Sequence, residues 1–464
     1  MSGYYIENFG CRAAQADGSA IERQLSSMGM RRVRDAEQAQ LVVLNTCTVT
    51  SAADHDARAA VRRIRRRQPQ ARILVTGCYA QRAPAEIAQL DGVTWVVGNS
   101  HKHRIAEIVS AEFTALNPAS GRDLNHAPGF VPLKNISGPT QVSSSLYVSD
   151  IFAHTELVAA PVFDAMERTR PNLKVQDGCN NRCSFCVIPS VRGQSRSLPL
   201  AAVLHEITEL ERAGYREIVI SGINLGRWGR DFGKQNNFVD LLRAILEHTS
   251  IEKLRLSSIE PMDWSDDLIH LVASSPRIAK HVHMPLQSGS DRVLRNMHRK
   301  YRPWHYAEKI EKIHTLIPDA AFGADVMVGF PGESDELFEE SRSFIADLPF
   351  TYLHVFTYSP RPGTPAASSP EQVPLTIARE RNRILRELAA EKNLQFRKGF
   401  VGKTVEAITL ASQEHGSTST LTDNFLKLQI EGEHAPNKWI RVLVSSATEQ
   451  GLSGHRTIVA DAVK

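Results

Sequence analysis

Short apolar runs alternate with amphipathic stretches along the first hundred residues. The runs expected to be strands lie at 4–9, 41–45, 73–77 and 95–98, and the stretches expected to be helices lie at 20–28, 52–67 and 84–90. Such an alternation of the two periods is typical of a parallel sheet with helices on its faces. We therefore predict an α/β class protein that begins with a parallel sheet domain over residues 1–112.

The pattern changes after this segment and then resumes. Residues 113–165 are rich in Pro, Gly and Ser, which predicts a connector with one strand near 146–151. Over 166–396 the strand and helix periods alternate again. The expected strands are 173–178, 217–222, 253–258, 281–286, 324–329 and 352–359, and the expected helices are 200–213, 238–248, 266–274, 306–316, 335–348 and 376–398. Six such units favour a partial (β/α)6 barrel over a closed eightfold one.

The last segment, 397–464, has a third pattern. Its short strands, separated by turn residues, are expected at 402–411, 427–432, 438–447 and 457–463. A segment of this kind predicts a small antiparallel β-barrel, a form that often binds single-stranded nucleic acid.

Composition narrows the class of protein. A length of 464 residues is enough for about three domains, and a hydrophobic content of 42% is enough to fill their cores. The net charge of +4 suits a nucleic-acid partner without requiring one. We find no apolar run long enough to cross a bilayer and no apolar core of a signal peptide at the start. The expectation is a cytoplasmic protein with no membrane partner.

The chain has six cysteines in two groups. Cys179, Cys183 and Cys186 form a C-x3-C-x2-C loop after a predicted strand. The others, Cys11, Cys47 and Cys78, each follow a predicted strand, and the carboxyl ends of parallel strands meet at one edge of a sheet. Cysteine thiolates are the usual ligands of iron–sulfur clusters, and a 4Fe-4S cluster with three protein ligands leaves one iron open. Two such clusters would use every cysteine.

Other uses of these cysteines fit the sequence less well. A closed zinc site needs four ligands, and the loop has no second cysteine pair, while the nearest histidines, His154 and His205, lie well outside it. A disulfide scaffold is disfavoured because the cysteines are few and no secretory segment is evident. Three buried structural thiols remain an alternative for the first group.

The loop DGCNNRCSFC resembles the signature of radical S-adenosylmethionine enzymes. The resemblance implies that the open iron binds the amino and carboxylate groups of S-adenosylmethionine, whose reductive cleavage gives an adenosyl radical. Later strand ends carry SGINLG, SSIEP, PLQSGS and VGFPGE, which fit the same cofactor cradle. The cofactor-binding residues expected from these motifs are Phe185, Gly222, Asn224, Ser257, Ser258, Glu260, Gln287 and Gly329.

The wider chain is similar to the methylthiotransferase family. FGCRAAQAD, NTCTVTSAAD and TGCYAQ resemble the motifs that hold its amino-terminal cluster, and HMPLQSGSDRVL, ADVMVGFPGE and YSPRPGTPA look most like the branch acting on N6-threonylcarbamoyladenosine in tRNA. The last segment is similar to a TRAM domain, which in this family holds the RNA. One departure is Ala14, where the family usually has Asn.

This resemblance implies a transferase that adds a methylthio group to C2 of N6-threonylcarbamoyladenosine next to the anticodon. The cluster on the loop would generate the radical that removes the C2 hydrogen, the other would present sulfur, and a second S-adenosylmethionine would give the methyl group. The implied partners are the tRNA anticodon stem-loop, an electron donor such as a flavodoxin or ferredoxin, and a sulfur donor. Seven arginines between Arg58 and Arg72 are candidate phosphate contacts.

Two sets of alternatives stay open at this point. Within the family, the substrate would be isopentenyladenosine in tRNA or an aspartate of a ribosomal protein. In another class, the chain would be a non-catalytic RNA-binding sensor whose clusters respond to iron or oxygen. The sensor has no use for the cofactor motifs, so formation of 5'-deoxyadenosine separates the two classes.

Overall fold

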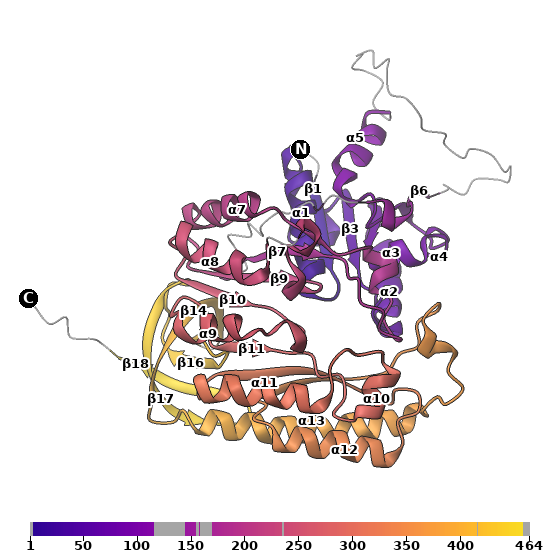
Figure 1. The fold of residues 1–464 in the computed structure, drawn as a ribbon. Helices are drawn as coiled ribbons and strands as arrows, with labels where there is room; N and C mark the ends of the chain where they lie inside the picture. Colours follow the sequence, from indigo (N-terminus) through magenta and orange to yellow (C-terminus); the bar gives the residue numbers. More distant parts are fainter. Residues whose placement is uncertain are drawn as a thin grey trace, which may run out of the picture. The chain divides into compact units, whose positions relative to one another are not determined.

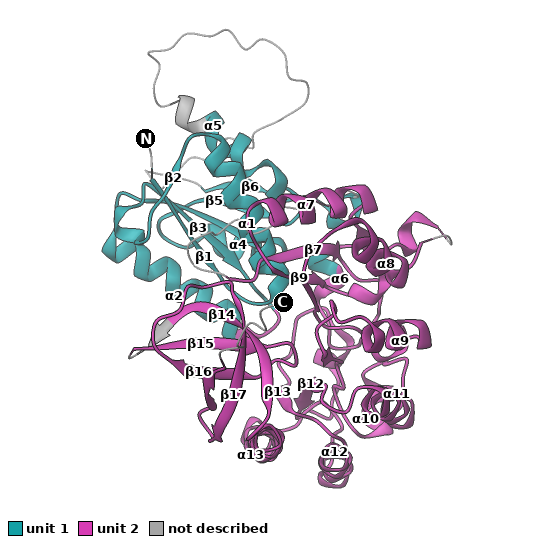
Figure 2. Cartoon of the chain, turned by 90° about the vertical axis from the view of Figure 1, so that its left-hand side faces the viewer, with its two compact units in different colours: residues 1–48, 52–154, 190–192 teal, residues 49–51, 155–189, 193–464 magenta. Residues whose placement is uncertain are grey.

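A computed structural model describes residues 3–115, 144–154, 157, 169–233, 236–414 and 416–457. The chain divides into two compact units, drawn in different colours in Figure 2. Unit 1 comprises residues 1–48, 52–154 and 190–192, and unit 2 comprises 49–51, 155–189 and 193–464. The domain boundaries expected from the sequence stay predictions, and most of the connector lies outside the described residues.

Unit 1, coloured indigo to purple in Figure 1, is built on one parallel sheet. Its strand order is β2-β1-β3-β4-β5-β6. Its strands are β1 (Gly3–Asn8), β2 (Arg31–Arg32), β3 (Leu41–Thr46), β4 (Arg72–Gly77), β5 (Val93–Gly98) and β6 (Ser145–Tyr147). Its helices are α1 (Arg12–Ser27), α2 (Ser51–Arg67), α3 (Cys78–Arg82), α4 (Pro84–Ala88) and α5 (Ile105–Ala115). The predicted parallel sheet is therefore present.

Each face of this sheet buries its own core. Leu41, Val43 and Leu74 pack with side chains of α1 and α5, whereas Val42 and Leu44 pack with side chains of α2, α3 and α4. Alternate residues of a strand point to opposite faces, so a strand covered on both sides is apolar throughout. The uninterrupted apolar run at the start of β3 follows from this arrangement.

The central part of unit 2 repeats a strand and a helix six times. The parallel strands are β7 (Asn172–Asp177), β9 (Glu217–Gly222), β10 (Lys253–Leu256), β11 (His281–His283), β12 (Ala321–Val328) and β13 (Tyr352–Thr357), and β8 (Arg196–Ser197) runs antiparallel to β7. The helices are α7 (Leu200–Arg212), α8 (Phe238–His248), α9 (Asp266–Ser274), α10 (Asp291–Asn296), α11 (Pro303–Leu316), α12 (Asp335–Asp347) and α13 (Leu375–Lys398), and α6 (Ile188–Arg192) is divided between the two units.

These strands form two hydrogen-bonded sheets, β10-β9-β7-β8 and β11-β12-β13. A parallel bridge between Leu254 and Ile278 continues the strand sequence from the first sheet towards the second. One large apolar core fills the space between the strands and the helices outside them. The arrangement is the open, incomplete barrel that the sequence predicts.

The carboxyl-terminal part of unit 2 is a closed barrel with the strand order β14-β15-β16-β18-β17. Its strands are β14 (Thr404–Glu414), β15 (Ser417–Thr422), β16 (Lys427–Glu431), β17 (Trp439–Ala447) and β18 (Leu452–Arg456). Strands β15 and β18 were not predicted from the sequence, and the strand expected at 457–463 lies almost entirely outside the described residues. The predicted α/β class with a small carboxyl-terminal β-barrel is nevertheless confirmed.

No helix among the described residues is long and apolar enough to cross a membrane.

Candidate active site

The first three cysteines lie at one edge of the unit 1 sheet. Cys47 directly follows β3 and Cys78 directly follows β4, and the last residues of these strands, Thr46 and Gly77, pair in register. Cys11 follows β1, whose Asn8 pairs with the penultimate residue of β3. The parallel register therefore brings three sulfur atoms that are distant in sequence to the carboxyl ends of three adjacent strands.

Two glycines allow the backbone to turn at this edge. Gly10 and Gly77 have φ of +98° and +95°, a region that residues with a Cβ rarely adopt. A Cβ on Gly10 would lie 2.6 Å from Cβ of Cys47, and one on Gly77 would lie 2.4 Å from the carbonyl oxygen of Thr46. The edge is thus packed so closely that only glycine fits.

Asparagine side chains support the same edge. Asn99 donates from Nδ2 towards Sγ of Cys78 at 3.5 Å. Asn45 donates from Nδ2 to Oδ1 of Asn8 at 2.9 Å and to the carbonyl oxygen of Ala14 at 2.6 Å. Ala14, the departure from the family pattern, is buried, and its main chain is held by Asn45. The sequence analysis did not single out Asn99.

The second cysteine group lies in the loop that follows β7 in unit 2. The loop begins at Gly178, which has φ of +74° and whose Cβ would lie 1.9 Å from the carbonyl oxygen of Gln194. The Cys179 N–H donates to the carbonyl oxygen of Gly193, and the Cys186 N–H donates to that of Cys183. Main-chain bonds therefore shape the loop, which leaves the thiol groups available as ligands.

Three donors point at sulfur atoms of this loop. The Asn181 N–H lies 3.4 Å from Sγ of Cys179, and Asn224 Nδ2 lies 3.7 Å from the same atom. On the other side, Arg299 donates from Nη1 to Sγ of Cys183 at 3.3 Å. Hydrogen bonds to cluster sulfurs are one means by which a protein stabilises a cluster and sets its potential.

Burial disfavours the charged form of two of the loop thiols. It raises the pKa of Cys179, and it raises the pKa of Cys186 to about 12. A thiol must lose its proton to become a metal ligand, so metal binding here is coupled to proton release. The nearby amide and guanidinium donors favour the thiolate form.

Three of the expected cofactor contacts carry buried polar atoms that find no hydrogen-bond partner in the described part of the chain. They are Oδ1 of Asn224, Oγ of Ser257 and Oε1 of Gln287. Asn224 is held by its N–H, which donates to the Gln176 side chain at 2.7 Å. Buried polar atoms are rarely left without partners, so this group fits a ligand rich in amino and hydroxyl groups, as S-adenosylmethionine is.

Other expected contacts are already engaged within the protein. Glu260 pairs with Arg299, and Ser258 Oγ lies 2.5 Å from Nδ1 of His283. Gly329 has φ of +73°, and its N–H donates to the carboxylate of Glu333. Gly222 packs against the side chain of Gln176. These residues support the strand ends, and their contact with a cofactor stays a prediction.

A cavity of about 300 Å³ lies in unit 2 beside the cysteine loop. Phe185 and Cys186 line it from the loop, and Gln287, Met327 and Phe356 line it from the strands and strand ends of the partial barrel. Phe185 also meets the ring of Phe330 edge to face at 6.4 Å, so it both packs on the core and faces the cavity. The cavity is mainly apolar and is large enough for a nucleobase-sized group.

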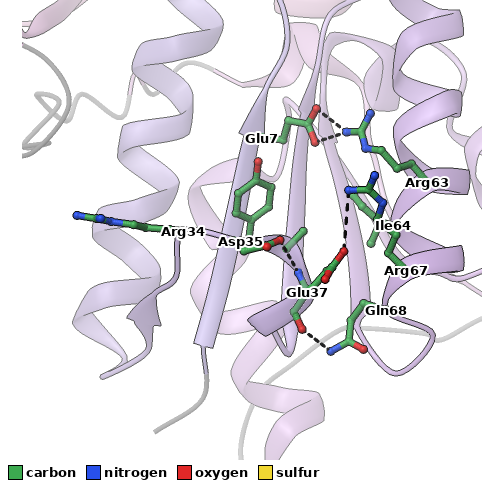
Figure 3. A pocket seen from close by; sticks show the side chains of 10 residues that line it. Glu7, Arg34, Asp35, Glu37, Arg63, Ile64, Arg67 and Gln68 are labelled. Atoms are coloured by element: carbon green, nitrogen blue, oxygen red, sulfur yellow. Dashed lines mark hydrogen bonds and ion pairs between the residues drawn. The ribbon is translucent and has the colours of Figure 1, made fainter. Parts of the chain in front are cut away.

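The arginines of α2 mostly have acidic partners. Arg63 bonds to both oxygens of Glu7 at 2.8 Å, and Arg67 lies 3.9 Å from Glu37 (Figure 3). These pairs line a small hollow of about 120 Å³ in unit 1. Arg58 and Arg65 pair likewise with acidic side chains. The exposed Arg62 and Arg66 form no ion pair within the described residues, so only part of the basic segment is available to phosphates.

Two family profiles match these parts of the chain. Residues 173–345 match the radical SAM superfamily, and residues 3–98 match the uncharacterized protein family UPF0004. The fold agrees: the structure of the radical S-adenosylmethionine methyltransferase TsrM from Kitasatospora setae, solved with cobalamin and a [4Fe-4S] cluster, superimposes with a TM-score of 0.55 at 16% identity, covering 79% of this chain and 77% of that one. The partial barrel and its cysteine loop thus define a radical SAM protein.

Relatives of known name cover nearly the full length. The threonylcarbamoyladenosine tRNA methylthiotransferase MtaB of Aquifex aeolicus is 35% identical over 95% of this chain and 99% of its own length, and the protein of that name from Bacillus subtilis is 35% identical over 96% and 94%. A tRNA-2-methylthio-N(6)-dimethylallyladenosine synthase of Acidothermus cellulolyticus is 31% identical over 99% and 90%. The chain belongs to the radical SAM methylthiotransferase family. Its predicted cofactors, S-adenosylmethionine and 4Fe-4S clusters, are confirmed at the level of this family.

Proposed function

We propose that this chain is a tRNA methylthiotransferase that converts N6-threonylcarbamoyladenosine, next to the anticodon, to its 2-methylthio derivative. The observation that carries the reaction type is the presence of two cysteine trios, one at the carboxyl ends of three parallel strands and one in the loop after β7. The substrate rests on the names of relatives that are 31% to 35% identical over nearly their whole length.

Each trio has a separate proposed role. Cys179, Cys183 and Cys186 would hold the cluster that binds S-adenosylmethionine, and Cys11, Cys47 and Cys78 would hold the auxiliary cluster. When bound, these groups supply a carbon-centred radical, sulfur and a methyl group, which side-chain acid–base chemistry cannot supply at a C2–H bond. We accordingly assign no general acid or base.

The residues around the loop would bind and orient the cofactor. Gln176 fixes the main chain of Asn224, whose free Oδ1 can accept a bond from an amino group. Ser257 and Gln287 offer further buried polar atoms, and Arg299 supports Cys183. The apolar walls of the cavity, Met327 and Phe356 among them, would keep water from the reacting carbon.

Reaction also requires partners from outside the chain. An electron donor such as a flavodoxin or ferredoxin would reduce the cluster, and a sulfur donor would replenish the sulfur that each turnover consumes. The tRNA would bind through exposed cations, for which Arg62 and Arg66 in unit 1 and Lys427 and Arg441 on the carboxyl-terminal barrel are candidates.

Nucleoside analysis tests the substrate directly. A strain lacking this gene should lose 2-methylthio-N6-threonylcarbamoyladenosine from its tRNA and accumulate the unmethylthiolated nucleoside. Restoring the wild-type gene should restore the product, and restoring a Cys186→Ala gene should not. An unchanged level of the product in the deletion strain would remove this substrate.

A second substrate is favoured by one observation. Relatives named for N6-dimethylallyladenosine match at 30% to 32% identity, only slightly below the first group. The same nucleoside analysis separates the two, because 2-methylthio-N6-dimethylallyladenosine would then be the species that disappears.

A further inference from the structure

Unit 2 carries a group of ionisable side chains that the proposed reaction does not use. His283, Asp325 and His354 lie on the adjacent strands β11, β12 and β13. Asp325 is paired in register with His354, and His283 pairs with Gly323, two residues before Asp325. Because alternate residues of a strand share a face, these three side chains project on the same side of the sheet.

The three possible ligand atoms converge. Oδ1 of Asp325 lies 3.2 Å from Nδ1 of His354 and 3.5 Å from Nε2 of His283, and all three atoms lie within 4.8 Å of one another. In the part of the chain that the structure describes, no other three His, Cys, Asp or Glu side chains lie close enough to share one ion in this way.

Neighbouring side chains fix the orientation of His283. Its Nδ1 lies 2.5 Å from Oγ of Ser258, while its buried Nε2 makes no hydrogen bond among the described residues and faces Asp325. The ring of Tyr352 stacks on that of His283 at 5.9 Å, in space that opens because Gly323 has no Cβ. A histidine that binds a metal typically donates its other ring N–H to a nearby acceptor, and Ser258 is placed to accept it.

The charges of the group suit a cation. Burial raises the pKa of Asp325, but the nearby imidazoles of His283 and His354 outweigh this and hold the pKa well below its usual range. A simple hydrogen-bonded cluster would explain the contacts equally well if each ring nitrogen that faces Asp325 carried a proton. The two interpretations differ in whether an ion replaces those protons.

We infer that His283 Nε2, the Asp325 carboxylate and His354 Nδ1 bind one divalent transition-metal ion, for which Zn²⁺ is the test case. Two imidazoles and one carboxylate are a common donor set for Zn²⁺, Fe²⁺ and Mn²⁺. Ligand bonds of about 2.1 Å require donor atoms roughly 3 to 4.2 Å apart, so the site closes with only a small movement.

The remaining coordination positions of the ion would be accessible to other ligands. Asp325 also lines the 300 Å³ cavity beside Cys186, and 63% of the His354 side chain is exposed. An ion held here is therefore reachable from solvent, and an oxygen ligand such as a carboxylate or hydroxyl group in the cavity could complete its coordination. The inference does not depend on the proposed function, because its measurement is metal binding rather than turnover.

The test uses the anaerobic full-length protein with its iron–sulfur clusters assembled. The protein is equilibrated with buffered Zn²⁺, freed of unbound ions, and analysed for zinc and iron together. We expect one zinc per chain in excess of the background. Its extended X-ray absorption fine structure should show nitrogen and oxygen neighbours, including two imidazoles. Asp325→Asn and His354→Ala should each remove this zinc without changing the iron content.

His248→Ala is the matched control, since it removes an exposed histidine at the end of α8, far from the group in sequence and outside the strands that form it. That variant should keep the zinc. The inference is overturned if the wild type binds no zinc above background, if His354→Ala binds as much as wild type, or if the zinc neighbours are sulfur, which would place the ion on cluster cysteines. A normal iron content in Asp325→Asn and His354→Ala shows that these two variants fold.

Discussion

Each cysteine group brings three thiols together, but the structural cause differs between the two groups. In unit 2, Cys179, Cys183 and Cys186 lie within one short loop, so local sequence alone places them together. In unit 1, Cys11, Cys47 and Cys78 meet only because three parallel strands pair in register. The first arrangement depends on loop shape and nearby donors, and the second depends on the fold of a whole sheet.

Substitution of single cysteines should break this comparison most severely. Cys186→Ala should abolish formation of 5'-deoxyadenosine, because the ligand set of the loop becomes incomplete. Cys47→Ala should leave that formation in place and abolish the methylthio product, because only the auxiliary cluster is affected. Each variant should keep about four of about eight iron atoms per chain, since each cluster holds four. Quantifying the two products by mass spectrometry checks the division of labour.

A failure of this division would be informative. Equal loss of 5'-deoxyadenosine in both variants would mean that the two cysteine groups do not act separately. Cys47→Ser is a milder companion, because it keeps the size of the side chain.

Gly77→Ala should show the dependence of the unit 1 cysteines on main-chain geometry. The new methyl group would meet the carbonyl oxygen of Thr46 at 2.4 Å, at a φ of +95°. We expect a loss of roughly 1–3 kcal/mol of stability from the backbone strain alone, and a selective loss of iron from the auxiliary cluster. Iron content and the thermal midpoint of the anaerobic protein measure both effects.

Gly29→Ala is the control for Gly77→Ala. Gly29 also has a positive φ, +78°, but an added Cβ would meet nothing within 4 Å. It should therefore lose stability by strain yet keep all its iron. Iron loss in both variants would show that positive φ, rather than the close approach to the main chain of Thr46, is responsible.

Much of this contrast could be predicted from the sequence, because strand and helix periods and the cysteine positions are local signals. The helix expected at 238–248 begins at Phe238 because Asn237 and Asp240 form a capping box. Strand β15 was missed because STSTLT is nearly all Ser and Thr, which resembles a turn segment although most of its residues are buried.

Side chains that contact a site residue from a distant position in the sequence gave no such signal. Arg299 lies 116 positions from Cys183, and nothing in MHRKY indicates that its guanidinium is buried against a thiol. The same holds for Asn99 at Cys78, and for His283 and His354, whose convergence requires two strand pairings. Tertiary contacts of this kind follow from topology rather than from local pattern.

Arg299→Lys should sharpen the comparison on the unit 2 side. Lysine keeps the positive charge but cannot donate to both Cys183 and Glu260 with the planar geometry of a guanidinium. Losing a supporting hydrogen bond typically costs about 10- to 100-fold in metal affinity or activity. We expect slower 5'-deoxyadenosine formation and a lower reduction potential of the loop cluster, measured by EPR-monitored titration.

Arg295→Lys is the matched control for this variant, because Arg295 lies nearby on α10 and, among the described residues, forms an ion pair only with the partly exposed Asp291. Its cluster potential should equal that of the wild type. An unchanged potential in Arg299→Lys would show that the contact with Cys183 is only a packing contact.

The smallest expected effect concerns which unit contributes more to RNA affinity. Replacing both Arg62 and Arg66 by Ala removes the two exposed guanidiniums of α2 that lack acidic partners among the described residues. Each lost phosphate contact should lower the slope of log affinity against log salt by about 0.7 to 0.9. Arg63→Ala, which removes a side chain already paired with Glu7, should leave the slope unchanged. Replacing Lys427 and Arg441 together tests the carboxyl-terminal barrel in the same assay. If only the replacement of Lys427 and Arg441 lowers the slope, the arginines of α2 are a solvated surface. RNA recognition then belongs to unit 2, in which a single loop supplies all three cysteines.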